Sequence, residues 1–146
     1  MTEEQVTKAV ISWLSEHEWV VLDYDFPGGG TGRRFRLAES AKRGDKNAGA
    51  FCPDIVAWKD GRFLLFENKS QDTVSDYAKQ SAVKRDVTLQ GQLTAAYPGR
   101  DLRDVSVALA FPPPFVHEDM AMSCGIDLVL TVADDLSVSV KWERRP

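Results

Sequence analysis

The sequence predicts a single α/β domain in which a mixed β-sheet is flanked by helices. The chain has 146 residues, which suits one domain with one hydrophobic core. Apolar residues recur at helical spacing near the N-terminus, whereas several later runs are short and rich in strand-forming residues. The resulting order, α-β-β-β-α-β followed by α-β-β, implies a mixed sheet with helices on its faces.

The first helix is expected to begin at Glu3, because Thr2 and Gln5 have the spacing of a capping box. It should end near His17. Its apolar stripe is formed by Val6, Ala9, Val10, Trp13 and Leu14. A strand is predicted over residues 19–24, and Pro27 followed by three glycines ends it. Residues 28–50 show no sustained periodicity and are predicted to form a long irregular insert.

The middle of the chain predicts a β-hairpin followed by a long helix. Residues 54–58 and 63–69 are apolar runs joined by a turn that contains Asp60 and Gly61, a strong hairpin signal. A helix is expected from Ser75 to about Tyr97, although Val87 and Thr88 weaken its middle. The remaining expected elements are a buried parallel strand (105–111), a short helix (117–124) and two final strands (126–132 and 136–142).

Composition and charge narrow the class of protein. No window approaches the ~18 apolar residues of a membrane span, and the acidic N-terminus is unlike a signal peptide, so we expect a cytoplasmic protein without a membrane partner. The two cysteines, Cys52 and Cys124, are expected to be reduced. Gly28–Gly32 lacks the Gly-Lys-Ser/Thr ending of a phosphate loop, so no nucleotide cofactor is expected.

Basic side chains are concentrated in the predicted insert. The net charge of the chain is −4, yet residues 28–50 carry six basic and two acidic side chains. This local excess has two interpretations, a solvated polar loop or a basic arm that contacts the phosphates of a nucleic acid. The candidate nucleic-acid-binding residues are Arg33, Arg34, Arg36, Lys42, Arg43 and Lys46.

The register of the hairpin brings charged side chains together. If Asp60 and Gly61 are the two turn residues, Lys59 lies opposite Arg62, and the same register places Asp54 opposite Glu67. Since side chains alternate along a strand, Lys69 lies on the same face as Glu67. The hairpin therefore predicts two carboxylates and one ammonium at one end of an apolar β-ribbon.

Like charges directly opposite each other destabilise a sheet, and unpaired charge at the edge of a core is costly. A positive group must compensate Asp54 and Glu67, and a hard divalent cation prefers oxygen ligands of this kind. The structural alternative is a surface hairpin end whose acids face water and pair with Lys69. We favour the metal site, because all three polar residues converge beyond an apolar stretch.

Pro53-Asp54 and Glu67-Asn68-Lys69 form the pattern Asp-x12-Glu-x-Lys. This pattern resembles the active-site motif of the PD-(D/E)xK nuclease superfamily. The surrounding string PDIVAWKDGRFLLFENKS is similar to the same segment in restriction endonucleases and archaeal Holliday-junction resolvases. The resemblance covers about residues 2–111 and implies a single-domain restriction-endonuclease-like fold.

The resemblance also implies roles for individual residues. Asp54, Glu67 and the backbone carbonyl of Asn68 would bind Mg²⁺, for which Mn²⁺ would substitute, and Lys69 would orient or help to deprotonate the attacking water. Many members add an acid from the first helix. Glu3 is our choice as this further catalytic and metal-binding residue, because it points nearer to the apolar stripe than its substitute, Glu4. The alternative is that both acids only favour the dipole at the N-terminus of the helix.

Members of the superfamily often place a further Gln or Lys on the helix after the motif, near the scissile phosphate. The candidates are Lys79, Lys84, Gln90 and Gln92, and Gln90 is a marginal preference. The histidines His17 and His117 have no acid or nucleophile at a useful spacing. We therefore expect no triad of the serine-histidine-aspartate kind.

The leading interpretation is a Mg²⁺-dependent DNA endonuclease of a restriction or defence type. The resemblance implies products with 5′-phosphates and a homodimer for cleavage of both strands. Junction resolution is an alternative, although the chain is acidic outside residues 28–50. Two further alternatives are a non-catalytic nucleic-acid-binding subunit with a nuclease fold and a generic α/β domain.

Overall fold

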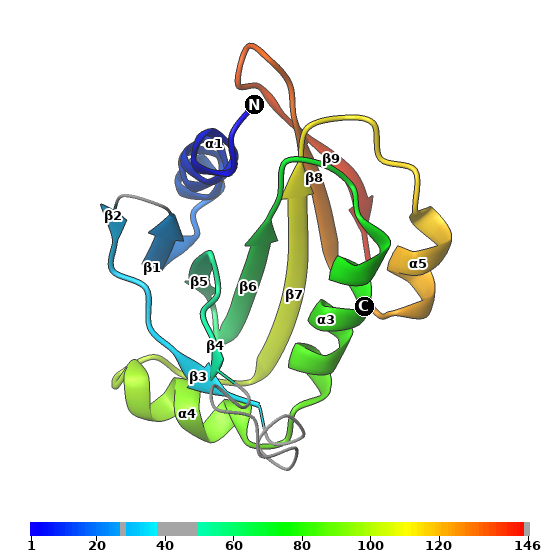
Figure 1. Cartoon of the computed structure of the whole chain (residues 1–146). Coiled ribbons are helices and arrows are strands. Elements are labelled where there is room, and N and C mark those ends of the chain that lie inside the picture. The colour runs from blue at the N-terminus through cyan, green and yellow to red at the C-terminus, as the bar shows by residue number, and fades with distance from the viewer. Residues whose placement is uncertain (27–28, 38–49, 145–146) are drawn as a thin grey trace.

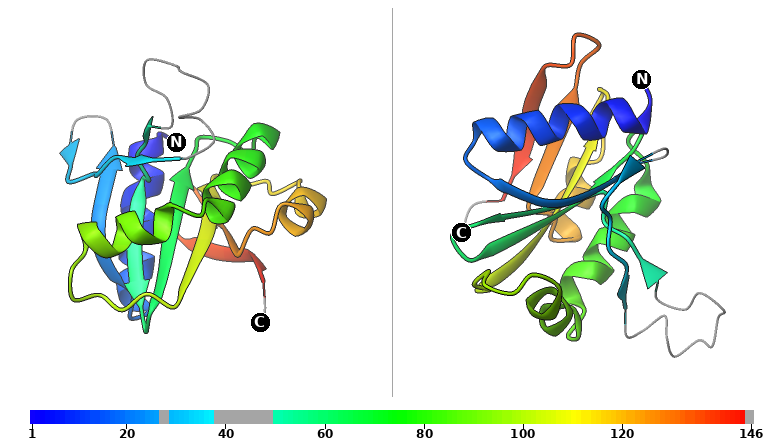
Figure 2. Two further views of the ribbon diagram at one scale, coloured as in Figure 1. Left: turned by 90° about the horizontal axis from the view of Figure 1, so that it is seen from below. Right: turned by 90° about the vertical axis from the view of Figure 1, so that its left-hand side faces the viewer.

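The computed structural model describes residues 1–26, 29–37 and 50–144. A seven-stranded sheet forms the centre of the fold, in the order β2-β1-β5-β6-β7-β8-β9. Helix α1 covers one face of this sheet, and α3, α4 and α5 lie on the other (Figure 1). Figure 2 shows α1 and α3 on opposite sides of the strands. The predicted mixed sheet with flanking helices is confirmed.

The first part of the chain follows the predicted order closely. Thr2 caps the first helix, and the capping box with Gln5 is present. The strands of the hairpin are antiparallel, and the first of them also pairs with the strand that follows the helix. The elements are α1 (Glu3–Glu16), β1 (Val20–Phe26), β5 (Ile55–Lys59) and β6 (Arg62–Asn68).

The insert is more regular than the sequence predicts. Among its described residues, β2 (Gly29–Gly30) extends the main sheet beside β1. The strands β3 (Phe35–Arg36) and β4 (Ala50–Phe51) form a separate two-stranded sheet. Phe35 is buried in the main core, so the insert is anchored by an apolar side chain that its polar surroundings conceal in the sequence.

The second half of the chain supplies the parallel part of the sheet. Strand β7 lies between β6 and β8 and is parallel to both, as predicted for an apolar run buried on both faces. The two final strands that the sequence predicts are present, and they pair antiparallel. The elements are β7 (Asp104–Phe111), α5 (Glu118–Ser123), β8 (Leu128–Val132) and β9 (Val138–Glu143).

The single long helix predicted from Ser75 to Tyr97 is wrong, because the structure has two helices there. They are α3 (Val74–Arg85) and α4 (Leu89–Ala96). Asp86 between them has an extended backbone, and its carboxylate accepts hydrogen bonds from the N–H and the hydroxyl of Thr88. A local side-chain acceptor thus competes with the helical hydrogen bonds and turns the chain.

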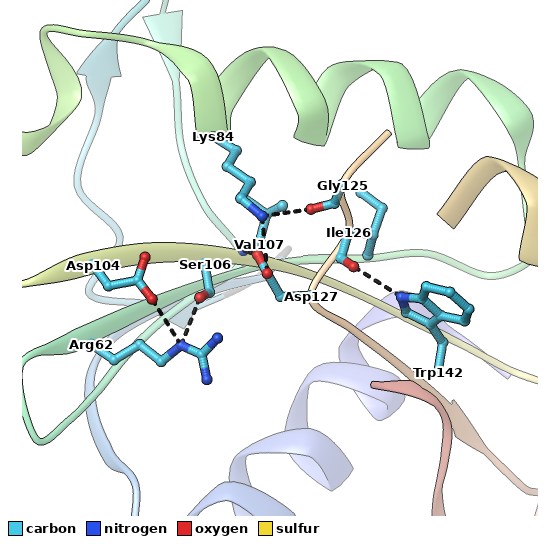
Figure 3. Close-up of polar contacts among 9 residues, drawn as sticks. All are labelled: Arg62, Lys84, Asp104, Ser106, Val107, Gly125, Ile126, Asp127 and Trp142. Carbon is cyan, nitrogen blue, oxygen red and sulfur yellow. Dashed lines mark hydrogen bonds and ion pairs between the residues drawn. The ribbon is translucent and has the colours of Figure 1, made fainter. Parts of the chain in front are cut away.

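Polar contacts fasten the parallel strands to their neighbours (Figure 3). The carboxylate of Asp127, 8% exposed, accepts hydrogen bonds from the Val107 N–H at 2.9 Å and from Lys84 at 2.9 Å. Lys84 also donates to the carbonyl of Gly125 at 2.7 Å. The indole of Trp142 donates to the Ile126 carbonyl at 2.9 Å. These contacts join α3, β7, the start of β8 and β9.

None of the helices in the described ranges combines the length and the apolar character that a membrane crossing requires.

Candidate functional site

The turn of the β5–β6 hairpin sets the register that was predicted. Asp60 and Gly61 have φ values of 49° and 86°, which is the left-handed region that a type I′ turn needs at both central positions. Lys59 consequently lies opposite Arg62, and the ladder continues to Ile55 opposite Phe66. The regular pairing ends there, and the N–H of Asp54 donates to the Phe66 carbonyl at 2.9 Å.

Asp54 lies at the mouth of the hairpin beside the end of β6. One of its carboxylate oxygens, Oδ2, accepts a hydrogen bond of 2.7 Å from the backbone N–H of Asn68. Burial and, next, the negative charge of Glu67 raise the pKa of Asp54 to about 7. The predicted proximity of the two acids is therefore present in the structure, although Asp54 stands just outside the strand.

Glu67 and Lys69 form an ion pair of 3.1 Å, with 21% and 29% of their side chains exposed. Burial raises the pKa of Glu67, and the positive charge of Lys69 lowers it by less, so the net shift is upward. Burial lowers the pKa of Lys69, but the charges of Glu67, Asp76 and Glu3 outweigh that effect, so the net shift is upward. The surrounding carboxylates therefore favour the ammonium form of Lys69.

Helix α1 is tied to the site through a buried amide. The Asn68 side chain is 1% exposed and donates to the Thr7 hydroxyl at 2.9 Å, which in turn donates to the Glu3 carbonyl. The first turn of the helix is thereby held over the end of β6. Glu3 is exposed, but its charge contributes to the pKa shifts of Asp54 and Lys69.

Helix α3 adds an acid that the sequence analysis missed. Asp76 lies in the first turn of this helix, is 4% exposed, and has its pKa raised mainly by burial. Its charge acts on both Glu67 and Lys69, and Lys79 on the next turn acts on Glu67. The available signal was an acid in the first turn of the helix directly after the motif.

The other candidates on the helices after the motif have structural partners instead. Lys84 is committed to Asp127 and the Gly125 carbonyl. The Gln92 amide exchanges two hydrogen bonds with the backbone of Arg36, at 2.8 and 2.7 Å. Gln90 is exposed on α4, and the described structure gives it no contact with the hairpin acids. The structure does not bring Gln90 to the site.

The basic residues of the insert divide into two groups. Arg33 pairs with the buried Asp23 at 3.3 Å and lies over the ring of Tyr97, which fastens the insert to the body of the protein. Arg34 and Arg36 are exposed. The other three predicted nucleic-acid-binding residues, Lys42, Arg43 and Lys46, lie outside the described residues.

The donor chemistry of the hairpin end fits a hard divalent cation. Oδ2 of Asp54 and Oε1 of Glu67 have protein partners, so within the described structure each carboxylate keeps one oxygen for a metal. The Asn68 carbonyl follows Glu67 directly, and Mg²⁺ commonly uses one or two carboxylates and several waters. In the described ranges, no group of three or more His, Cys, Asp or Glu side chains is placed to hold a metal. Glu3 as a further ligand therefore stays a prediction.

One histidine has an acid partner that its sequence position did not indicate. Nδ1 of His117 lies 2.9 Å from Oδ1 of Asp72, a residue 45 positions earlier in the chain. The sequence prediction rested on spacing along the chain alone and therefore did not find this pair. The reason is topological, because the loop after β6 and the loop after β7 leave the sheet at the same edge.

Comparison with known proteins gives distant structural likeness alone. No family model and no curated protein matches this sequence. An XisH family protein from Nostoc punctiforme is 13% identical, with 96% of this chain and 99% of that chain covered and a TM-score of 0.42. An FdxN element excision controlling factor protein from Anabaena variabilis is also 13% identical, with coverage of 93% and 96% and a TM-score of 0.40.

Proposed function

We propose that this chain is a Mg²⁺-dependent endonuclease that hydrolyses phosphodiester bonds in DNA. The observation that carries the proposal is the half-buried pair Asp54 and Glu67, both with raised pKa values, beside the protonated Lys69. Two partly buried carboxylates that repel each other destabilise the fold at this end of the hairpin. Perturbed carboxylates of this kind are typical of functional sites.

Binding of a divalent cation explains why the protein keeps this destabilising pair of carboxylates. Two carboxylates with one shared lysine leave net negative charge in a partly desolvated place, and a bound cation would reverse the upward pKa shifts. Asp54, Glu67 and the Asn68 carbonyl would hold Mg²⁺, with Mn²⁺ as a substitute. When bound, the metal supplies polarisation of a phosphoryl oxygen and a water that ionises near neutral pH.

The protein side chains then position the substrate phosphate and stabilise the transition state. Lys69, held by Glu67, donates to a phosphate oxygen and offsets the charge that grows in the transition state. The ion pair with Glu67 holds the ammonium at the end of β6, where it can take this electrostatic role. Asp76 and Glu3 keep it protonated, while the Asn68 amide fixes the strand end against Thr7 of α1.

The wider function follows from the same proposal. Arg34 and Arg36 are exposed and available for phosphates of the DNA backbone, together with the basic residues of the insert outside the described ranges. A homodimer would place two such sites on opposite strands. The resemblance of the motif supports products with 5′-phosphates and a restriction or defence role.

A cleavage assay with matched variants tests the proposal. Supercoiled plasmid is incubated with the wild-type protein and Mg²⁺, beside Asp54→Asn, Glu67→Gln and Lys69→Met. The matched control Glu16→Gln changes an exposed carboxylate of α1 away from the hairpin acids. We expect nicked and linear plasmid with the wild type and the control, at least 100-fold less with each site variant, and none in EDTA.

Two outcomes contradict the proposal. A wild-type protein that leaves both plasmid and single-stranded DNA intact over a range of Mg²⁺ and Mn²⁺ concentrations is not this nuclease. Cleavage that persists in both Asp54→Asn and Lys69→Met places any activity elsewhere in the chain.

A further inference from the structure

The carboxylate of Asp72 joins three parts of the fold next to the hairpin acids. Its side chain is 3% exposed and accepts hydrogen bonds from the Tyr77 hydroxyl at 2.7 Å and the Val116 N–H at 2.8 Å. His117 Nδ1 lies 2.9 Å from the same carboxylate, close but without the angle of an aligned hydrogen bond. The loop after β6, helix α3 and the N-terminus of α5 therefore meet at Asp72.

This assembly is adjacent to the candidate catalytic lysine. Strands β6 and β7 are parallel, and the N–H of Lys69 donates to the Ala110 carbonyl at 2.9 Å. Both strands thus end at the same edge of the sheet, which is where ligands commonly bind in sheets of this kind. Asp72 is three residues beyond Lys69, a span of about 10 Å at most.

The arrangement fixes the imidazole of His117. A buried carboxylate is costly unless donors surround it, and Asp72 receives its donors from the fold itself. Burial raises the pKa of Tyr77, so its hydroxyl stays protonated and donates. Nδ1 is turned toward this carboxylate, so Nε2 is the ring nitrogen that remains for an external partner, and it donates to an anion only when both ring nitrogens carry a proton. The side chain is 24% exposed, and its ring stacks edge-on against Tyr77.

We propose that His117 is a substrate-binding residue whose Nε2 contacts a DNA phosphate that flanks the scissile one, with Asp72 as its positioning residue. This inference rests on the proposed nuclease function. A DNA strand carries one phosphate per ~3.4 Å of helix axis. His117 is held beside Asp72, which lies at most about 10 Å along the chain from Lys69, so its imidazole would meet a phosphate a few nucleotides from the scissile one. The contact supplies affinity and register without reading the sequence.

Two substitutions separate the two ring nitrogens. His117→Asn keeps an amide donor toward Asp72 and removes the outward group, whereas His117→Gln places an amide nitrogen near the position of Nε2. His17→Ala is the matched control, since this exposed histidine ends α1 and bonds to the Trp13 carbonyl. Circular dichroism and thermal melting establish that each variant is folded.

Binding of a short fluorescein-labelled DNA duplex is measured by anisotropy, with Ca²⁺ in place of Mg²⁺ so that the strand stays intact. We expect about tenfold weaker binding for His117→Asn, as for one charge-assisted hydrogen bond. The slope of log K against log salt should fall by about one. His117→Gln should recover part of the affinity but not the salt slope, because its amide donates a hydrogen bond without carrying a charge. His17→Ala should bind as the wild type does. In cleavage, KM rises while kcat stays within about twofold.

Equal affinity and an equal salt slope for the wild type and a folded His117→Asn overturn the inference. Loss of affinity in both His117 variants with an unchanged salt slope also overturns it, because that pattern indicates a structural role. Binding without cleavage contradicts the proposed catalysis alone, and the His117 comparison still decides this inference. A wild-type protein that binds no duplex overturns both.

Discussion

Replacement of Asp54 by asparagine removes a negative charge that burial and the neighbouring Glu67 both disfavour. The pKa of Asp54 rises from 3.8 to about 7 in the folded protein. At about 1.4 kcal/mol per pKa unit, this shift corresponds to at most about 4 kcal/mol of lost stability at high pH. Water reaches the partly exposed carboxylate and screens its charge. The free energy of unfolding should therefore rise by about 2 kcal/mol in Asp54→Asn.

The sign of the pH dependence follows from the direction of the shift. Below the pKa that Asp54 has in the unfolded chain, its carboxyl is protonated in both the folded and the unfolded state. Asp54→Asn is then little more stable than the wild type. Between about pH 4 and pH 7 the unfolded chain loses this proton while the folded protein retains it, so the wild type becomes less stable as the pH rises. Above pH 7 the full penalty is present. Asp54→Asn removes it and keeps an oxygen that can accept the Asn68 N–H.

The assay is thermal melting in EDTA at pH 4.5, 6 and 8. For a chain of this size 1 kcal/mol corresponds to about 3 °C, so we expect Tm to rise by about 6 °C at pH 8 and by little at pH 4.5. Mg²⁺ at ten times its Kd should stabilise the wild type by about 1.4 kcal/mol and leave the variant unchanged. An Asp54→Asn protein that is less stable than the wild type at pH 8 would refute the electrostatic reasoning.

Three further substitutions test how the site is supported, each by urea unfolding. Lys84→Met leaves the buried Asp127 carboxylate without its charge partner, and we expect a loss of about 3 kcal/mol; a loss below about 1 kcal/mol contradicts that. Gly61→Ala forces a side chain into φ +86°, with an expected cost of about 1–2 kcal/mol, and an unchanged midpoint would refute the turn geometry. Thr7→Val removes the acceptor of the buried Asn68 amide, with an expected loss of about 1–3 kcal/mol that a silent variant would contradict.

The hairpin and its acids could be predicted because the information is local. Asp60-Gly61 determines the turn, the turn determines the register, and the register carries Asp54 to the end of β6 near Glu67. The same holds for the first helix, where Thr2 and its capping box begin the element as expected. These features depend on residues within about fifteen positions of each other along the chain.

The missed features depend on contacts between distant segments. His117 meets Asp72 only because β6 and β7 are parallel neighbours, and no spacing in the sequence encodes that adjacency. Asp76 reaches the site because α3 begins directly over the strand ends. Between α3 and α4, the side-chain hydrogen bonds of Asp86 end a helix that the sequence predicts only to be weakened at Val87 and Thr88.

The central claim is that the mouth of the hairpin binds a catalytic divalent cation. Anomalous scattering from a crystal grown with Mn²⁺ measures this directly. The account predicts a peak bonded to the carboxylates of Asp54 and Glu67 and to the Asn68 carbonyl, and no peak there in Asp54→Asn. A saturated wild-type crystal without density at this position, or with Mn²⁺ bound only elsewhere, contradicts it.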